Sequence, residues 1–208
     1  MRGFFISVEG SDGSGKSTQI KKIDEYLKSK NQEVLLTREP GGTVISEKIR
    51  ELLLDPSHKE MKAKTEMLLY AAARAQHLEE FILPSLQAGK HVLTDRFTDS
   101  SIAYQGFGRG LGEIVAEVNR IATGGISPDI TFFLELSPEA GIARKISEEN
   151  HEMDRLEQEK QEFHQRVYDG YKTLCESEGQ RICLIDASAG IEAVFSHIKV
   201  ELDRLFGF

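Results

Sequence analysis

Residues 10–17 read Gly10-Ser11-Asp12-Gly13-Ser14-Gly15-Lys16-Ser17, and they fit the pattern G-x-x-x-x-G-K-[ST] at every fixed position. The apolar run 4–8 before them predicts a strand, and the helical spacing of Ile20, Ile23 and Leu27 after them predicts a helix. This strand–loop–helix order is typical of a phosphate-binding loop (P-loop), because its glycines let backbone N–H groups converge on a phosphate at a helix N-terminus. The sequence therefore predicts a nucleotide-binding protein.

Each part of this loop has an expected task. Lys16 is expected to bridge the β- and γ-phosphates of the nucleotide, and the Ser17 hydroxyl is expected to bind Mg²⁺. The residues expected to bind the nucleotide phosphates are Gly10, Ser11, Asp12, Gly13, Ser14, Gly15, Lys16, Ser17 and Thr18.

Strand-like and helix-like stretches alternate through the rest of the chain. Further strands are predicted at 34–36, 91–94, 130–136 and 182–185, and further helices at 45–53, 63–83, 114–121, 163–174 and 194–205, with one more beginning after Ser137. Pro84 is expected to kink or end the long helix before it. The alternation predicts a three-layer α/β fold, in which helices cover both faces of a five-stranded parallel sheet and ligands bind beyond the carboxyl ends of the strands. Because no Pro/Gly/Ser-rich linker interrupts the 208 residues, we expect one domain, 1–208.

The composition narrows the classes of function. The formal net charge of -8 argues against broad binding to DNA or RNA, which needs basic surface. No stretch approaches the ~18 apolar residues of a membrane span, and the chain runs from Met1 into a strand-like segment rather than a signal peptide, so we expect a cytoplasmic protein. Cys175 and Cys183 have no motif partners and are expected to be reduced packing residues rather than a redox pair or a metal site.

A P-loop occurs in GTPase switches, in ATP-driven motors and in small kinases. The guanine-reading motif N-K-x-D is absent, and a motor normally carries more sequence for coupling to a partner. Arg38 follows the second strand and Arg96 follows the third, so both are expected at the ligand end of the sheet. Two arginines at one crevice can clamp a second phosphate group, which a hydrolase does not need. This pair favours a kinase.

Further motifs carry a resemblance to a known family. They are Thr37-Arg38-Glu39-Pro40-Gly41-Gly42, Tyr70 with Ala73-Arg74, Asp95-Arg96-Phe97, Ser101 with Tyr104-Gln105-Gly106, and Asp154-Arg155-Leu156-Glu157. Together with the P-loop, their order and spacing resemble the thymidylate kinase family over nearly the whole chain. The resemblance implies a P-loop kinase that phosphorylates dTMP to dTDP for dTTP synthesis, with ATP as phosphate donor and Mg²⁺. It also implies a homodimer, with the apolar helices after strands two and three as the candidate interface.

The resemblance implies a role for each residue of the acceptor site. Arg38 and Arg96 would hold the dTMP phosphate, and Asp12 would orient the sugar hydroxyl or the acceptor phosphate. Tyr70 and Arg74 lie one helical turn apart, so an aromatic ring can stack on the pyrimidine while the guanidinium donates to a carbonyl on its edge. The remaining residues implied at the acceptor are Ser101 and Gln105, at the imide edge of thymine, and Tyr104, where a 2'-hydroxyl would sit.

Catalysis is expected to come from alignment and charge, because the acceptor is already an anionic phosphate oxygen. Lys16, Mg²⁺ and Arg96 would supply positive charge, and Asp95 would be an outer or inner ligand of the metal. Glu9 can serve the same site or make a structural hydrogen bond. Arg50 either supports the phosphate site or is a plain surface residue.

A lid is expected at about 143–155. Position 13 is Gly, so the P-loop offers no arginine for the transferred phosphoryl group. Arg144 is therefore the first candidate for that role and Lys145 the second, while the motif around Arg155 looks structural or directed at adenine. The turn 186–188 after the fifth strand is a further candidate for adenine contacts.

Two rival functions remain open from the sequence. One is a kinase for another nucleoside monophosphate or for a deoxynucleoside. The other is a non-catalytic nucleotide-binding switch, which would bind ATP without acceptor-dependent turnover. The two expected phosphate clamps argue against the switch.

Overall fold

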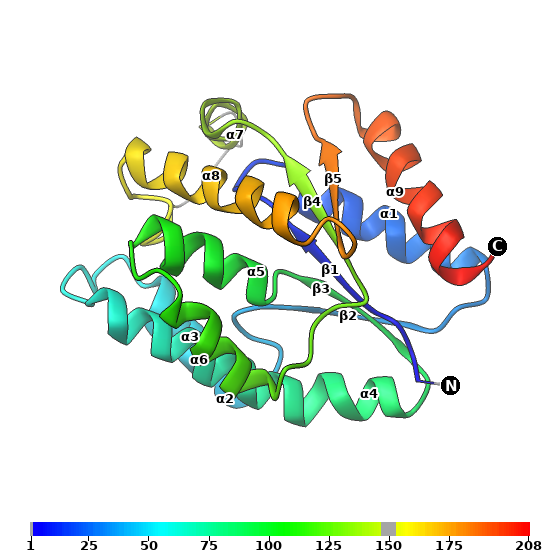
Figure 1. The fold of residues 1–208 in the computed structure, drawn as a ribbon, viewed down its shortest axis with the longest axis horizontal. Helices are drawn as coiled ribbons and strands as arrows, with labels where there is room; N and C mark the ends of the chain where they lie inside the picture. Colours follow the sequence, from blue (N-terminus) through cyan, green and yellow to red (C-terminus); the bar gives the residue numbers. More distant parts are fainter. Residues whose placement is uncertain (1, 147–152) are drawn as a thin grey trace.

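The structure, a computed structural model, describes residues 2–146 and 153–208 of the chain. Its centre is a sheet of five parallel strands in the order β2-β3-β1-β4-β5 (Figure 1). The strands are β1 (Phe5–Glu9), β2 (Val34–Arg38), β3 (His91–Asp95), β4 (Ile130–Glu135) and β5 (Ile182–Asp186). The five-stranded parallel sheet predicted from the sequence is confirmed.

Helices cover both faces of this sheet (Figure 1). They are α1 (Lys16–Ser29), α2 (Val44–Leu54), α3 (Ala63–His77), α4 (Leu83–Gln87), α5 (Thr98–Ser101), α6 (Ile114–Thr123), α7 (Pro138–Ile146), α8 (Gln161–Ser177) and α9 (Ile191–Phe206). Ile6 packs in a core cluster with side chains of α1 and α9, whereas its neighbour Phe5 packs on the other face with the helical stretch 78–86. Successive side chains of a strand point to opposite faces, so β1 is buried on both. The three-layer arrangement is therefore confirmed as well.

Two helical features differ from the sequence-based expectation. The long helix does not end at Pro84: after α3 it widens into a π-helical turn, Leu78–Ile82, and continues as α4 to Gln87. Pro84 lies in the first turn of α4, where a missing N–H costs little because the wider turn has already displaced the regular hydrogen bonds. The second feature is a helical stretch without a counterpart in the prediction, α5 followed by a π-helical segment, Ile102–Gly108. Of the two expectations for Pro84, an end of the helix there is wrong, and the helical stretch 98–108 was not predicted, because π-helical turns have no simple hydrophobic period.

Candidate active site

The P-loop connects the carboxyl end of β1 to the N-terminus of α1, as predicted. Gly10 has φ 148°, and a Cβ there would lie 2.9 Å from the carbonyl oxygen of Leu134. Gly15 adopts a left-handed conformation, φ 91°, at the residue where α1 begins. Among the described residues no side chain caps this helix, so its first N–H groups are directed at the loop, together with the positive end of the helix dipole. The loop therefore has the geometry of an anion site.

Lys16 lies across the loop rather than in solvent. Its Nζ donates to the carbonyl oxygens of Gly10 and Ser11, at 3.0 and 3.1 Å, and lies 3.9 Å from Asp12 Oδ1. Burial lowers the pKa of Lys16, and the nearby Arg96 lowers it further, against the carboxylates of Asp12 and Asp95. The ammonium is thus desolvated, which strengthens its interaction with a phosphate.

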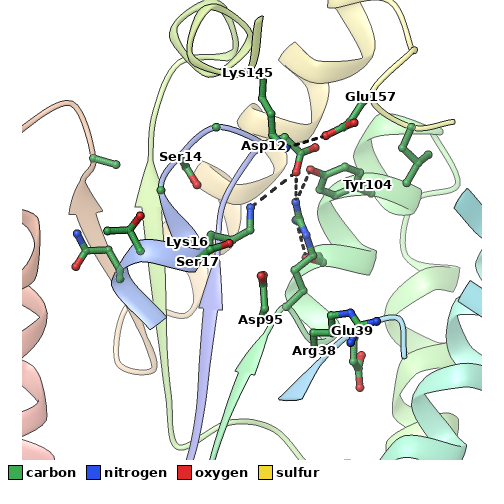
Figure 2. Close-up of a pocket in the computed structure, with 18 of the residues that line it drawn as sticks. Asp12, Ser14, Lys16, Ser17, Arg38, Glu39, Asp95, Tyr104, Lys145 and Glu157 are labelled. Atoms are coloured by element: carbon green, nitrogen blue, oxygen red, sulfur yellow. Dashed lines mark hydrogen bonds and ion pairs between the residues drawn. The ribbon is translucent and has the colours of Figure 1, made fainter. Parts of the chain in front are cut away.

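One continuous cavity of about 990 Å³ opens beside the loop (Figure 2). Nearly all the residues that the sequence assigned to phosphates, acceptor and metal line it, the exceptions being Gly10 and Ser11 at the base of the loop. They come from the P-loop and α1, from the ends of β2 and β3, from α3, from the stretch 98–108, and from α7. The carboxyl ends of parallel strands share one edge of a sheet, which is why residues so distant in sequence meet here.

Arg96 stands at the centre of this cavity wall with a strained backbone. Its φ of 71° lies in the left-handed region, and its N–H donates to the carbonyl of Val8 at 3.0 Å, which holds the conformation. The guanidinium donates to Asp12 Oδ1 at 2.8 Å and to the Tyr104 hydroxyl at 3.1 Å. Burial alone would raise the pKa of Asp12, but Arg96 and Lys16 together lower it below its ordinary value. Asp12 is therefore an ionised link between the two cations. Such strain in a non-glycine residue is typical of functional sites.

The second predicted phosphate arginine, Arg38, lies at the neighbouring strand end. It is directly opposite Asp95 in the parallel register of β2 and β3. Its guanidinium donates to Glu47 at 2.9 Å and is half exposed, so it faces the cavity with freedom to move. Arg50 lines the cavity too, and its Nη1 donates to the carbonyl of Pro40 at 2.9 Å. Of the two sequence-based interpretations of Arg50, support of the phosphate site agrees with this contact to the Arg38 loop.

Arg74 is anchored more deeply than the sequence suggested. It is only 2% exposed, and it donates to Glu39 Oε2 at 2.7 Å, Ser101 Oγ at 2.9 Å, Asn119 Oδ1 at 2.5 Å and the carbonyl of Phe97 at 3.0 Å. The buried Glu39–Arg74 pair joins the Arg38 loop to α3, and the bonds to Ser101 and Phe97 join α3 to the stretch after β3. Arg74 is thus both a cavity-lining residue and a structural centre of the site.

Other residues predicted at the base of the acceptor line the cavity as well. They are Tyr70, Tyr104 and Gln105. The Gln105 amide donates to the buried carboxylate of Glu66 at 2.9 Å, and Glu66 also pairs with Arg109 at 2.9 Å. This side of the cavity therefore combines aromatic rings with fixed amide and hydroxyl groups, which suits a flat heterocycle with polar edges.

The predicted metal ligands lie together beside Lys16. Ser17 and Asp95 both line the cavity. Figure 2 shows the Asp95 side chain directed into it, below Lys16 and Ser17. The buried Oδ1 of Asp95 has no hydrogen-bond partner among the described residues. A buried carboxylate oxygen without a partner is unusual, and one carboxylate with one hydroxyl fits Mg²⁺, which takes its other ligands from phosphates and water. No cluster of three or more His, Cys, Asp or Glu side chains suited to a metal occurs in the part of the chain that the structure describes.

Glu9 belongs to a different group of side chains. Its carboxyl accepts a hydrogen bond from the backbone N–H of Phe97 at 2.6 Å, and its Oε2 lies within hydrogen-bond distance of Ser100 Oγ, at 2.5 Å, and of the Tyr171 hydroxyl, at 2.8 Å. These contacts agree with the structural hydrogen bond, the second of the two interpretations drawn from the sequence. Ser100 and Tyr171 were missed, because nothing in the local sequence of α5 or α8 indicates that their hydroxyls meet a carboxyl on β1.

The two cations of the described part of the lid have different partners. Arg144 donates to the carbonyl of Gly13 at 3.4 Å and to that of Ala187 at 3.1 Å, so it bridges the P-loop and the loop after β5. Lys145 pairs with Glu157 at 3.3 Å and also contributes to the low pKa of Asp12 (Figure 2). Residues 147–152 of the predicted lid lie outside the described residues.

Arg155, which follows the lid, has a structural environment. It is buried, pairs with Glu66 at 2.8 Å and donates from Nε to the carbonyl of Leu53 at 2.8 Å.

The loop after β5 also reaches the cavity. Ala187 and Ser188 line it together with 189–191, whereas Asp186 accepts from the N–H of Ser188 at 2.9 Å and shapes the turn. This loop continues the cavity beyond the P-loop, where the base of a bound nucleotide would extend.

Comparison with known proteins agrees with this geometry. A family model described as "Thymidylate kinase" matches residues 8–198. The chain belongs to the thymidylate kinase family. It is 49% identical over 206 residues to a thymidylate kinase from Lactobacillus helveticus (strain DPC 4571), covering 98% of this chain and 97% of that one. It is 50% identical over 196 residues to a thymidylate kinase from Lactobacillus delbrueckii subsp. bulgaricus, covering 93% and 92%. Among solved structures, the crystal structure of thymidylate kinase from Ehrlichia chaffeensis matches with a TM-score of 0.78 and 32% identity, covering 98% of this chain and 99% of that chain.

Proposed function

We infer that this chain transfers the γ-phosphoryl group of ATP to dTMP and releases dTDP and ADP, a reaction that serves dTTP synthesis. The observation that carries the inference is the pair of arginines at adjacent strand ends, Arg38 and Arg96, in the same cavity as the P-loop. One anion site holds the donor phosphates and the other clamps the acceptor phosphate. A nucleotide-binding switch needs only the first.

The acceptor base is proposed to lie against Tyr70, Arg74, Ser101 and Gln105. Tyr70 offers a ring face, and Arg74 and Gln105 are held by the buried carboxylates of Glu39 and Glu66. Fixed donors reject a base with the wrong edge, because an unpaired buried polar group is costly. Tyr104, whose hydroxyl is bonded to Arg96, would exclude a 2'-hydroxyl from the sugar site.

The proposed mechanism relies on positioning. An oxygen of the dTMP phosphate attacks the γ-phosphorus in line while the bond to the β–γ bridging oxygen breaks, and ADP leaves with the bonding electron pair. Lys16 contacts the β- and γ-phosphates, Arg96 holds the acceptor, and Asp12 keeps the two cations at a fixed separation. Ser17 and Asp95 would hold Mg²⁺, which neutralises phosphate charge when bound. Arg144 is the proposed lid cation, with Lys145 as the second candidate.

The test is an assay of ADP formation against a panel of acceptors. Rapid turnover with dTMP, and turnover at least about 100-fold slower with the other acceptors, is expected. The fixed donors of the base site should reject dCMP and AMP. Tyr104 should reject the 2'-hydroxyl of UMP, and thymidine lacks the phosphate that Arg38 and Arg96 clamp. Preference for another monophosphate or for a deoxynucleoside would support the rival kinase. ATP binding without turnover on any acceptor would support the switch.

A homodimer is proposed on the basis of exposed apolar side chains on three neighbouring helices. Val44 and Ile45 on α2, Leu68 on α3, and Ile114 and Ile121 on α6 are each 48–72% exposed. α3 packs against both α2 and α6, so these side chains belong to one layer (Figure 1). Extended apolar surface of this kind marks an interface.

In the described part of the chain, no helix is both long enough and apolar enough to cross a membrane. A cytoplasmic location stays a prediction.

A further inference from the structure

Three buried oxygen atoms form a closed triangle beneath Arg96. They are Glu9 Oε2 at the end of β1, Ser100 Oγ on α5 and the Tyr171 hydroxyl on α8. Ser100 Oγ lies 2.5 Å from Glu9 Oε2, the Tyr171 hydroxyl lies 2.8 Å from it, and the two hydroxyls lie 2.8 Å from each other. The three residues are 0%, 8% and 2% exposed, respectively, so water does not share these contacts.

The number of hydrogens available to the triangle depends on the state of Glu9. Each of its three edges is short enough to be a hydrogen bond, and each bond needs one hydrogen. Ser100 and Tyr171 supply one hydrogen each. If Glu9 is ionised, one edge has two oxygens in contact without a hydrogen between them. A proton on Oε2 supplies the third hydrogen, and all three edges are then satisfied.

No other group of the site supplies that hydrogen. Arg96 Nη1 donates to Ser100 Oγ at 3.1 Å and to the Tyr171 hydroxyl at 3.3 Å, but these bonds use hydroxyl lone pairs and leave the triangle edges unbridged. The other carboxyl oxygen, Oε1, accepts from the N–H of Phe97 at 2.6 Å and from Ser7 Oγ at 3.3 Å. Oε1 therefore acts only as an acceptor, as the carbonyl oxygen of a protonated carboxylic acid does.

We propose that Glu9 carries a proton in the folded protein and, through Ser100 and Tyr171, positions Arg96 for the acceptor phosphate. Glu9 is a positioning residue, because it contacts Arg96 only through the two hydroxyls. This inference rests on the proposed placement of the dTMP phosphate at Arg96.

The charges around Glu9 agree with a retained proton. Burial raises the pKa of Glu9 to about 7, and the carboxylate of Asp99 on α5 adds to the rise, while Arg96 opposes it. Lys16 on α1 also interacts with Glu9, and the Tyr171 hydroxyl faces it from α8. Asp99 also pairs with Arg181 at 2.8 Å, so this cation lies next to the group as well.

The proton has a consequence for Arg96. With Glu9 neutral, Asp12 is the carboxylate that pairs directly with Arg96, and the guanidinium keeps most of its charge for a phosphate dianion. If Glu9 ionises, a second negative charge competes for Arg96 from below. Affinity for dTMP should therefore fall as the pH rises through the pKa of Glu9.

The direct test is infrared difference spectroscopy of the full chain and of Glu9→Gln, without substrates. The native protein is expected to show the carbonyl stretch of a buried carboxylic acid at about pH 5.5 and to lose it by about pH 9. The variant is expected to lack this band at every pH. Absence of this band from the native spectrum at the lower pH would overturn the proposal. The measurement needs no turnover, so it distinguishes failure of this inference from failure of the proposed function.

Kinetics supply the second test. The KM for dTMP of the native protein, divided by that of Glu9→Gln, is expected to be near one at about pH 6 and to rise at least about threefold by about pH 8.5. The ratio cancels the ionisation of dTMP itself. Tyr171→Phe keeps the ring stacked on Phe133 and should raise the KM for dTMP about fivefold with little change for ATP. Tyr168→Phe, on the same helix but bonded to Glu135, is the matched control and should change neither. A pH-independent ratio, or equal effects of the two tyrosine variants, would contradict the positioning role.

Discussion

The contacts of Lys16 indicate a role in phosphate binding and none in the apolar core. Its ammonium is buried over the P-loop by carbonyls of the loop itself, and it contributes no side chain to the apolar core. Lys16→Ala should therefore lower kcat by about 100-fold or more while the melting temperature changes little. Lys21→Ala, an exposed lysine on the same helix, is the control and should keep full activity. Near-normal turnover in Lys16→Ala would refute the phosphate-loop assignment.

Arg74 differs from Lys16, because its role in the fold cannot be separated from its role at the acceptor. Arg74→Ala leaves the buried Glu39 carboxylate without its main partner, so we expect the free energy of unfolding to fall by about 3–5 kcal/mol. We also expect the KM for dTMP to rise far more than the KM for ATP. Chemical denaturation and initial rates measure the two effects, with the exposed Arg120→Ala on α6 as control. Equal weakening of both substrates would remove Arg74 from the base site.

Local sequence was sufficient for some of these residues and insufficient for others. The P-loop, Arg38 and Arg96 could be assigned because short motifs place them at strand ends, and strand ends meet at one edge of a parallel sheet. The proton on Glu9 depends on Ser100 and Tyr171, 91 and 162 residues away in sequence. The anchoring of Arg155 depends likewise on Glu66 and Leu53. Such contacts are set by tertiary packing, and no pattern within one segment encodes them.

Among the elements, the strands and most helices followed from hydrophobic periodicity, and α7 also from its cap. Ser137 Oγ accepts from the N–H of Ala140 at 3.3 Å, and Pro138 is the first residue of the helix, as predicted. The stretch 98–108 was missed because its polar start and its glycines do not resemble an amphipathic helix. Its backbone changes from α to π geometry beside the site, where such turns are frequently found.

The position of α7 gives a prediction for the lid. Because Arg144 reaches carbonyls of both nucleotide loops, a closing movement of α7 would bring its charge toward the phosphates. Arg144→Ala should lower kcat about tenfold or more, with little change in ATP affinity. A tenfold loss corresponds to about 1.4 kcal/mol of transition-state stabilisation. Single-turnover rates and ATP titration measure the two quantities. Unchanged turnover here, with a large loss in Lys145→Ala, would move the role to Lys145; unchanged turnover in both would reject the lid cations.

For the whole molecule, Glu9 links stability to pH. Its pKa is about 7 in the folded chain against 4.5 as its ordinary value, so the folded state binds the proton more tightly than the unfolded state. The resulting stabilisation is present below about pH 4.5 and is lost as the pH rises through about 7. Glu9→Gln should therefore gain about 2–3 kcal/mol relative to the native protein between about pH 4.5 and about pH 8. Urea unfolding at both pH values measures this gain, and a pH-independent difference would contradict it.

The proposed dimer gives a second prediction at this scale. Ile121→Asp places a charge in the exposed apolar layer, where Ile121 is 70% exposed in the single chain. The variant should be monomeric by light scattering at concentrations where the native protein is a dimer, because an unpaired charge in an apolar interface is costly. Val200→Asp, on the exposed face of α9, is the control, and its molecular mass by light scattering should remain that of the native dimer. A native protein that is already monomeric would reject the interface.

The close approach of Gly13 and Gly141 also restricts how this sequence can change over generations. A Cβ at position 13 would lie 2.3 Å from the carbonyl oxygen of Gly141, and one at position 141 would lie 2.4 Å from that of Asp12. Gly13 moreover has φ 77°, which side chains other than glycine rarely adopt. A single mutation that introduces arginine at position 13 is therefore expected to be deleterious before any benefit appears. A lineage with this backbone would have to shift α7 before it could accept a side chain at position 13, and until then the proposed lid cation Arg144 could not be replaced from the P-loop.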